Sequence, residues 1–123
     1  MATVLVDARN VLRSEWPNIP EHELVALCRR WAAEKGRRVV VVFDREAPGG
    51  LVGRRTLDEA CELVGTGEES ADDWLRRAAR DCSAHERPYW LVTSDRELRA
   101  SAGTRAERVV GGGAFARALR SAS

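Results

Sequence analysis

Three short apolar segments of this chain each lead into an aspartate, and this repeated arrangement constrains the fold more than any other feature. The segments are rich in β-branched residues and show no polar alternation, which is typical of strands buried on both faces of a sheet. Such strands occur in parallel sheets that helices cover on both sides. The three pairs are Thr3–Val6 with Asp7, Arg38–Phe43 with Asp44, and Tyr89–Thr93 with Asp95.

Two segments between these strands have the periodicity of amphipathic helices. Apolar residues recur every three or four positions over Pro20–Lys35 and again over Ser70–Cys82. Gly36 is a typical stop for the first helix. At the start of the second helix, Ser70 and Asp73 have the spacing of a capping box. We therefore predict one long helix after the first apolar strand and a second before the strand at Tyr89.

The other segments predict shorter elements. Arg45–Arg55 carries one proline and three glycines and is predicted to be a surface loop. Ala60–Val64 is predicted to be a weaker strand, although Thr56–Val64 could also be helical. Ala8–Pro17 is predicted to be irregular or a single helical turn. The remaining predictions are a short helix over Arg96–Ala102, a short strand at Val109–Val110 and a last helix over Ala114–Arg120.

This order of elements alternates between strands and helices along the chain. Such alternation predicts an α/β fold with a mostly parallel central sheet of four to five strands and helices on both faces. The chain has 123 residues, which is a typical length for one domain, and no segment resembles a linker. We therefore expect a single domain over residues 1–123.

Composition argues against several classes of protein. No segment approaches the roughly 18 apolar residues of a membrane span, and the first residues lack the features of a secretory signal, so we expect a cytoplasmic protein with no membrane contact. The formal net charge of +1 indicates neither an acidic tail nor a strongly basic nucleic-acid binder. The three cysteines, Cys28, Cys61 and Cys82, are far apart and support neither a zinc site nor a disulfide framework, so we expect them to be buried. His22 and His85 do not follow predicted strands and are expected at the surface.

Acidic residues are predicted to gather at one edge of the sheet. The carboxyl ends of parallel strands lie at the same edge, where open α/β sheets bind their ligands. Asp7, Asp44 and Asp95 should therefore meet there. The helix that starts near Ser70 begins at this edge too. It would add Glu69, Asp72 and Asp73.

A cluster of carboxylates is unfavourable unless a positive charge compensates it. Two unit charges about 4 Å apart repel by roughly 4 kcal/mol at an effective dielectric constant near 20. Mg²⁺ takes oxygen ligands, keeps several waters and is held by one or two carboxylates together with substrate phosphate. Such a cation can activate water and stabilise the leaving oxygen in phosphodiester cleavage. The acids therefore predict a site for a divalent cation, Mg²⁺ or Mn²⁺.

Each acid also has a simpler explanation. Asp72 and Asp73 could complement the positive end of a helix, and the capping spacing favours this explanation for Asp73. Asp95 could cap the helix that follows it, and Asp44 could be an ordinary loop residue. Asp7 is different, because an aspartate directly after a buried first strand has no evident role in folding.

Four short motifs occur together over nearly the whole chain. They are Val4–Val11, which contains the D-x-x-N pattern of Asp7 and Asn10, then Val42–Asp44, Glu69–Asp72 and Val92–Glu97. In order and spacing they resemble the NYN branch of PIN-like nucleases, and within it the YacP-like group. Arg9 stands where family members often have tyrosine, and Ser70 replaces threonine at the helix start.

The resemblance implies a PIN-like three-layer α/β/α sandwich with metal-dependent endoribonuclease activity. The residues that would bind the metal, directly or through water, are Asp7, Asp72 and Asp95. Asn10 would orient a ligand or water beside Asp7, although it could also cap the next helical turn. Asp44 and Glu69 would complete the acidic ring. The implied partner is RNA, single-stranded and either free or on the ribosome.

Basic and aromatic residues near the same edge could contact RNA. Arginines bind phosphate oxygens, and aromatic rings stack on unpaired bases. The candidate arginines are Arg9, Arg45 and Arg96, with Arg13, Arg54, Arg55 and Arg99 nearby. Trp16 lies in a predicted loop and could be exposed for stacking. The other tryptophans, Trp31, Trp74 and Trp90, are expected in the core.

Three hypotheses for function remain after this reasoning. The first is a metal-dependent endoribonuclease. The second is a catalytically silent RNA- or ribosome-binding module that kept the acidic fold. The third is a phospho-acceptor receiver domain, which also gathers aspartates at strand ends but normally places a lysine beside the acceptor. The only lysine, Lys35, ends a helix on the side opposite the strand carboxyl ends, which argues against the third hypothesis.

Overall fold

The fold is built on a six-stranded sheet with the strand order β3-β4-β2-β1-β5-β6. The computed structural model describes residues 1–121. Neighbouring strands are parallel except β3, which is antiparallel to β4. The strands are β1 Thr3–Asp7, β2 Arg38–Phe43, β3 Gly53–Thr56, β4 Cys61–Gly65, β5 Tyr89–Val92 and β6 Arg108–Val110. The predicted α/β fold with a mostly parallel sheet is confirmed.

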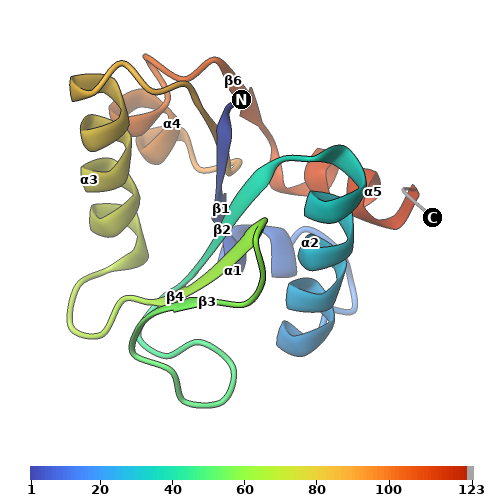
Figure 1. Ribbon diagram of the computed structural model, residues 1–123. Coiled ribbons are helices and arrows are strands. Elements are labelled where there is room, and N and C mark those ends of the chain that lie inside the picture. Colours follow the sequence, from blue (N-terminus) through green and yellow to red (C-terminus); the bar gives the residue numbers. More distant parts are fainter. Residues whose placement is uncertain (122–123) are drawn as a thin grey trace.

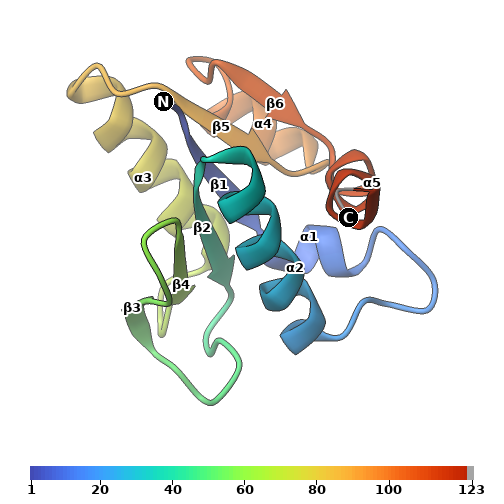
Figure 2. The ribbon, with the colours of Figure 1, turned by 45° about the vertical axis from the view of Figure 1, so that its right-hand side comes forward.

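Helices cover both faces of this sheet, which makes the molecule a three-layer sandwich. The helices are α1 Ala8–Leu12, α2 Glu21–Lys35, α3 Ala71–Ala84, α4 Arg96–Ala102 and α5 Gly112–Ser121. Helices α1, α2 and α5 pack on one face, and α3 and α4 pack on the other (Figures 1 and 2). None of the helices within residues 1–121 is long and apolar enough to cross a membrane.

The central strands contribute side chains to two separate cores. On β1, Val4 and Val6 belong to the core that contains Trp31 and Phe115, whereas Leu5 belongs to the core under α3. Trp31 and Phe115 meet edge to face, with ring centroids 5.2 Å apart. This arrangement explains the unbroken apolar character of the strand, because successive side chains point to opposite faces that are both covered.

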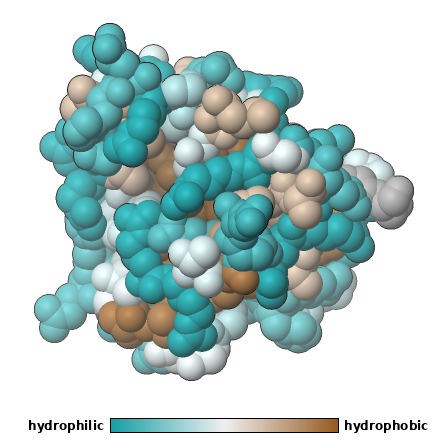
Figure 3. All heavy atoms as spheres, viewed as in Figure 1, coloured by the Kyte–Doolittle hydropathy of each residue, from teal (hydrophilic) through white to brown (hydrophobic). Residues whose placement is uncertain are grey.

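The cysteines and three of the tryptophans are largely buried, as the sequence predicts. Cys28 and Cys61 are buried and Cys82 is half-buried, and all three are free thiols. Trp74 and Trp90 are buried with Trp31, as predicted. Hydrophilic side chains dominate the face of the molecule shown in Figure 3. The large apolar side chains that remain exposed within residues 1–121 are Met1, Trp16 and Val52.

The sheet gains its sixth strand where a loop was predicted. Residues Gly53–Thr56 form the edge strand β3, and all four are exposed, so no apolar pattern marks them in the sequence. The strand is attached by a bidentate ion pair in which Arg54 donates to the carboxylate of Glu62 on β4, at 2.6 and 2.8 Å. The alternative of a helix over Thr56–Val64 is wrong, and the strand prediction for this region is confirmed.

A glycine at the end of β4 lets the preceding loop pack against the sheet. A Cβ at Gly65 would lie 2.0 Å from the carbonyl oxygen of Leu51, a distance that no real contact reaches. In the same loop, Ala47 is buried and forms an antiparallel bridge with Leu51. The segment predicted as a surface loop is therefore partly folded onto the end of the sheet.

Helix boundaries differ from the predicted ones by at most two residues. Helix α2 begins at Glu21 with Pro20 as its N-cap and ends before Gly36, which has a φ of 62°. At the start of α3, the backbone N–H of Asp73 donates to Ser70 Oγ at 3.0 Å, as the capping pattern predicts. This cap fixes the end of α3 that lies next to the carboxyl ends of β1 and β2.

We predict that side-chain packing around β2 contributes strongly to the free energy of unfolding. Val41 is fully buried in β2 and Val52 is 61% exposed, so the same truncation can be compared at the two positions. Val41→Ala should lower the free energy of unfolding by about 2 kcal/mol, because it removes buried methyl groups and leaves a cavity. Val52→Ala should change it by less than about 0.5 kcal/mol. Equal effects in urea unfolding would contradict the packing described above.

Candidate active site

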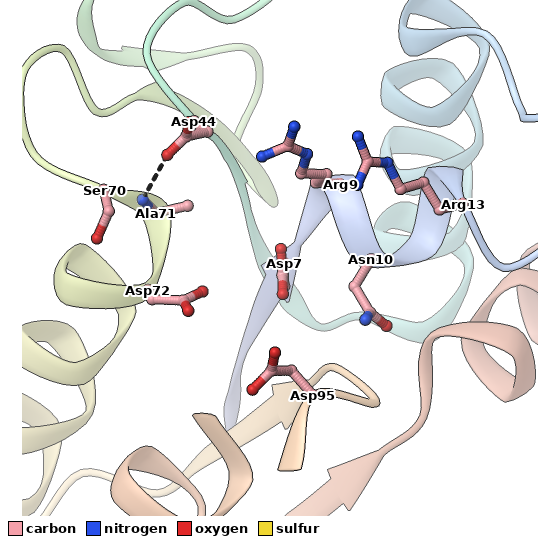
Figure 4. A pocket seen from close by; sticks show the side chains of 9 residues that line it. All are labelled: Asp7, Arg9, Asn10, Arg13, Asp44, Ser70, Ala71, Asp72 and Asp95. Carbon is pink, nitrogen blue, oxygen red and sulfur yellow. Dashed lines mark hydrogen bonds between the residues drawn. The ribbon is translucent and has the colours of Figure 1, made fainter. Parts of the chain in front are cut away.

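A cavity of about 420 Å³ lies at the carboxyl ends of β1 and β2. Its walls come from segments far apart in the sequence: the end of β1, helix α1, the residue after β2, the start of α3 and the residue before α4. Asp7, Asp72 and Asp95 point toward a common centre in this cavity (Figure 4). The lining residues are Asp7, Arg9, Asn10, Arg13, Asp44, Ser70, Ala71, Asp72 and Asp95.

The most buried acid of the cavity is Asp7. It is the last residue of β1 and is 7% exposed. Burial raises the pKa of its carboxyl above the ordinary value, and the hydrogen bond from the Thr93 hydroxyl to Oδ2, at 2.9 Å, opposes this shift. The negative charges of Asp72 and Asp95 raise the pKa further. The carboxylate is thus held in place mainly by the Thr93 hydroxyl, and its charge is only partly compensated.

The second acid, Asp72, lies in the first turn of α3. Burial is the main cause that raises the pKa of its carboxyl, and the charge of Asp95 adds to it, while Arg76 opposes it. The next residue, Asp73, behaves differently: its carboxylate accepts from Arg76 Nη1 at 2.9 Å at the surface. The two neighbours therefore differ in their surroundings, because Asp72 faces the cavity and Asp73 lies on the exposed surface of the helix.

Asp95 and Asp44 each use one carboxylate oxygen to hold the start of a helix. Asp95 Oδ1 accepts the N–H of Leu98 at 2.9 Å, so it is the N-cap of α4. Asp44 Oδ1 accepts the N–H of Ala71 at 2.9 Å, which joins the end of β2 to the start of α3. The capping explanation for Asp95 is therefore correct, and it is compatible with a place in the cavity because a carboxylate has a second oxygen.

A hydroxyl connects the two acids that lie on β1 and before α4. Thr93 Oγ1 donates to Asp7 and accepts the N–H of Asp95 at 3.2 Å. The Thr93 side chain is completely buried. Sequence reasoning did not assign it a role, although its position directly after an apolar strand and two residues before an aspartate is the signal that could have identified it.

Asn10 fixes the wall of the cavity rather than capping its own helix. Its side-chain Oδ1 accepts the N–H of Ser94 at 2.9 Å, and Ser94 Oγ accepts the N–H of Gly112 at 2.9 Å. A Cβ at Gly112 would lie 2.2 Å from Asn10 Oδ1, so only glycine allows this approach. The helix α5 begins at this glycine, two residues before the predicted start.

Three of the predicted site residues lie outside the cavity. Glu69 does not line it. Its carboxylate accepts hydrogen bonds from Arg77, an exposed residue of α3. Arg45 lines a separate cavity beside Val52, and Arg96 lies in the first turn of α4 without lining the acidic cavity. The prediction that Glu69 belongs to the acidic ring rests on its place before the helix start, whereas in the structure its carboxylate pairs with Arg77.

The cavity also has a basic wall. Arg9 and Arg13 line it from α1, one helical turn apart (Figure 4). Neither guanidinium forms an ion pair with any residue between positions 1 and 121. The raised pKa of Asp7 is consistent with this separation, because a paired arginine would lower it.

The donor set of the cavity fits a hard divalent cation. All the acidic groups are carboxylates, and two of them have pKa values raised by burial and by neighbouring negative charge. No group of three or more His, Cys, Asp or Glu side chains within the described chain lies close enough together to hold a metal ion by itself. A Mg²⁺ ion here would have one or two carboxylate ligands and complete its coordination with water and substrate oxygens.

Comparison with known proteins identifies related sequences and structures. The family model described as the YacP-like NYN domain matches residues 4–122. The crystal structure of Rae1 (YacP) from Bacillus subtilis is 22% identical, with a TM-score of 0.73, over 99% of this chain and 75% of that chain. A mutant of the same protein is 20% identical, with a TM-score of 0.75, over 99% of this chain and 77% of that chain. A search of curated protein sequences finds no significant match.

We predict that neutralising Asp7 stabilises the metal-free protein. Below the ordinary aspartate pKa of 3.8 the carboxyl is neutral in both folded and unfolded chains. As the pH rises through the elevated native pKa, the folded state must accept a poorly compensated charge and loses stability. Asp7→Asn should therefore raise the free energy of unfolding at pH 7, and this gain should shrink towards pH 4.

A second aspartate provides the control for this prediction. Asp58 pairs with Arg29 at 3.0 Å, and this hydrogen bond is the main cause that lowers its pKa. Asp58→Asn should therefore destabilise the protein at pH 7, opposite to Asp7→Asn. Thermal melting in EDTA between pH 4 and 7 measures both effects. A lower stability of Asp7→Asn at every pH would show that the carboxylate is not under electrostatic strain.

Proposed function

Because the chain belongs to the family of YacP-like NYN domains, a ribonuclease family, we propose that it is a metal-dependent endoribonuclease that cleaves RNA phosphodiester bonds at the acidic cavity. The observation that carries this proposal is the convergence of Asp7, Asp72 and Asp95 on one cavity at the carboxyl edge of a parallel sheet. Open α/β folds bind ligands at this edge. The poorly compensated charge of Asp7 and Asp72 supports a cation as the missing partner.

We propose that Asp7, Asp72 and Asp95 hold the cation, Mg²⁺ or Mn²⁺, directly or through water, with no more than two of the carboxylates as direct ligands. When bound, such a cation lowers the pKa of a coordinated water and compensates the charge that develops on phosphate oxygens. Asp44 completes the acidic wall from the end of β2 and holds α3 in position through the N–H of Ala71. Hydrogen bonds therefore hold the carboxylates of Asp7, Asp44 and Asp95 in place before substrate arrives, which is the condition for electrostatic catalysis.

The remaining residues of the cavity position the substrate and the acids. Arg9 and Arg13 have no ion-pair partner within residues 1–121, and their guanidinium groups suit bidentate contacts with phosphate oxygens of an RNA strand bound at the cavity. Thr93 and Asn10 act as positioning residues, because they hold Asp7, Asp95 and Ser94 without facing the reacting bond themselves. The substrate that fits an open cavity of this kind is single-stranded RNA, free or presented by the ribosome.

We predict that cleavage depends on the acids of the cavity and not on their neighbours. With Mn²⁺ or Mg²⁺, the protein should cut an end-labelled single-stranded RNA. Asp7→Asn and Asp72→Asn should lower the rate by about 100-fold or more, because they remove charge from the cation site. Asp95→Asn should do the same while keeping the helix cap, since asparagine also caps helices. The matched control is Asp73→Asn, next to Asp72, which should stay within about twofold of wild type.

The outcomes of this assay separate the two candidate functions. Equal cutting by wild type and by all the variants would indicate a contaminating nuclease and would reject the enzyme. Binding of RNA without any cutting by the wild type would instead favour a catalytically silent RNA- or ribosome-binding module. Loss of cutting in Asp73→Asn together with Asp72→Asn would contradict the separation of these two neighbours in the structure.

We predict that Mn²⁺ stabilises the protein through the same acids. A cation that binds only the folded state raises the free energy of unfolding by about 2.7 kcal/mol at 100 times its dissociation constant. The melting temperature should therefore rise by several degrees in millimolar Mn²⁺ at pH 7, and less at pH 5, because protons compete for Asp7 and Asp72. Asp7→Asn should abolish the rise and Asp73→Asn should keep it. No shift in the wild type would contradict a metal site.

A further inference from the structure

One large aromatic side chain of the described chain lies almost completely in solvent. Trp16 is 90% exposed, whereas the other three tryptophans are 5–8% exposed. It makes no aromatic or cation–π contact with any residue in the range 1–121. An indole ring in this state contributes nothing to the core, so its role has to be sought outside the fold.

Trp16 follows directly on the basic wall of the acidic cavity. The N–H of Arg13 donates to the carbonyl oxygen of Arg9 at 3.1 Å, so the two guanidinium groups leave the same side of one helical turn. Trp16 comes three residues after Arg13. Because three residues span no more than about 11 Å, the indole begins within that distance of the cavity wall. Two guanidinium groups and the indole thus follow one another along a short segment that starts at the cavity wall.

The segment that carries Trp16 is anchored at both ends. On one side, Ser14 Oγ donates to the carbonyl oxygen of Val11 at 2.6 Å. On the other, Ile19 is buried and its N–H donates to the carbonyl oxygen of Leu12 at 3.2 Å. A side chain presented on a fixed segment loses little conformational entropy when it binds a ligand.

Neighbouring charges leave this path positive. Glu15, the only acid next to Trp16, accepts from Arg120 of α5 at 3.2 Å. Arg9 and Arg13 have no acidic partner within residues 1–121. Free guanidinium groups beside an exposed aromatic ring match a chain that alternates phosphates with unpaired bases.

We propose that Arg9, Arg13 and Trp16 form a path for single-stranded RNA, in which the arginines bind phosphates and Trp16 stacks on a base upstream or downstream of the acidic cavity. This inference rests on the proposed function, because it names the way in which the substrate reaches that site. It favours RNA over a protein partner because two guanidinium groups with no ion-pair partner within residues 1–121 line the cavity wall on the segment that leads to the ring. It favours single strands because a base in a duplex has no free face.

The test measures binding without cleavage. A 12-nucleotide fluorescein-labelled single-stranded RNA is titrated in EDTA and followed by anisotropy. Trp16→Ala and Trp16→Leu should each weaken binding by about 5- to 150-fold, since both remove the stacking ring. Trp16→Phe, which keeps an aromatic ring, should stay within about threefold of wild type. Because Trp16 makes no buried contact, the three variants should melt at the temperature of the wild-type protein.

Three further measurements distinguish base stacking by Trp16 from electrostatic attraction to phosphates. The plot of log affinity against log salt concentration should keep its slope in Trp16→Ala, whereas Arg13→Ala should make it shallower by about 0.7, the value for one phosphate on a single strand. Tryptophan emission should fall when RNA binds the wild-type protein and stay constant in Trp16→Phe. On a blunt RNA duplex, Trp16→Ala should bind as wild type does.

The outcomes separate this inference from the proposed function. If the wild type cleaves RNA and Trp16→Ala binds it as tightly as wild type, the path is wrong and the enzyme assignment stands. If Trp16→Leu binds like wild type, the side chain acts as an apolar contact and the stacking proposal is overturned. If the wild type neither binds nor cleaves RNA, both proposals are rejected.

Discussion

The burial of the Asp7 carboxylate at the end of the central strand is the constraint on which the rest of the cavity depends. A charge placed there is removed from most of the surrounding water, and the charges of Asp72 and Asp95 act against it. The main compensating contact is the Thr93 hydroxyl, beside the backbone of Asn10, and this same hydroxyl accepts the N–H of Asp95. The position of the Asp95 backbone is thus tied to that of Asp7 through a single buried oxygen. A rigid acidic pair results, and its charge is balanced only when a cation or a proton joins it.

Hydrogen bonds at helix N-termini explain how several acids can lie at one edge of the sheet without forming ion pairs. Asp44 and Asp95 each accept one backbone N–H at the beginning of a helix, where the positive end of the helix dipole lies. These contacts stabilise the negative charge partially and leave a second oxygen on each carboxylate. The other acids near α3 are neutralised: Asp73 pairs with Arg76, and Glu69 pairs with Arg77. The difference between an acid of the cavity and an acid of the surface is therefore a direct ion pair with an arginine, which Asp73 and Glu69 form and which the cavity acids do not form within residues 1–121.

The elements that sequence reasoning identifies correctly are those defined by local patterns. β1 and β2 are continuous β-branched runs buried on both faces, and the start of α3 is predicted by its N-cap residue Ser70. The edge strand β3 escapes prediction because it is held by backbone pairing and by the Arg54–Glu62 ion pair, and neither leaves an apolar pattern. In the site, aspartates at strand ends can be located from topology alone. The roles of Thr93, Asn10 and Gly112 depend on contacts across about 80 to 100 positions of sequence, which no local pattern encodes.

The separation of acids and arginines within one cavity is the property that makes it suitable for a charged polymer. If Arg9 or Arg13 paired with Asp7, the pKa of that carboxyl would fall, whereas burial and its acidic neighbours raise it. The two kinds of charge therefore face the cavity without cancelling each other. A cation can neutralise the acids, and the phosphates of an RNA chain can pair with the arginines. The bound cation and the bound phosphates attract each other, so each favours binding of the other. Binding of metal and of RNA is expected to be mutually reinforcing for this reason, since linkage between two ligands acts equally in both directions.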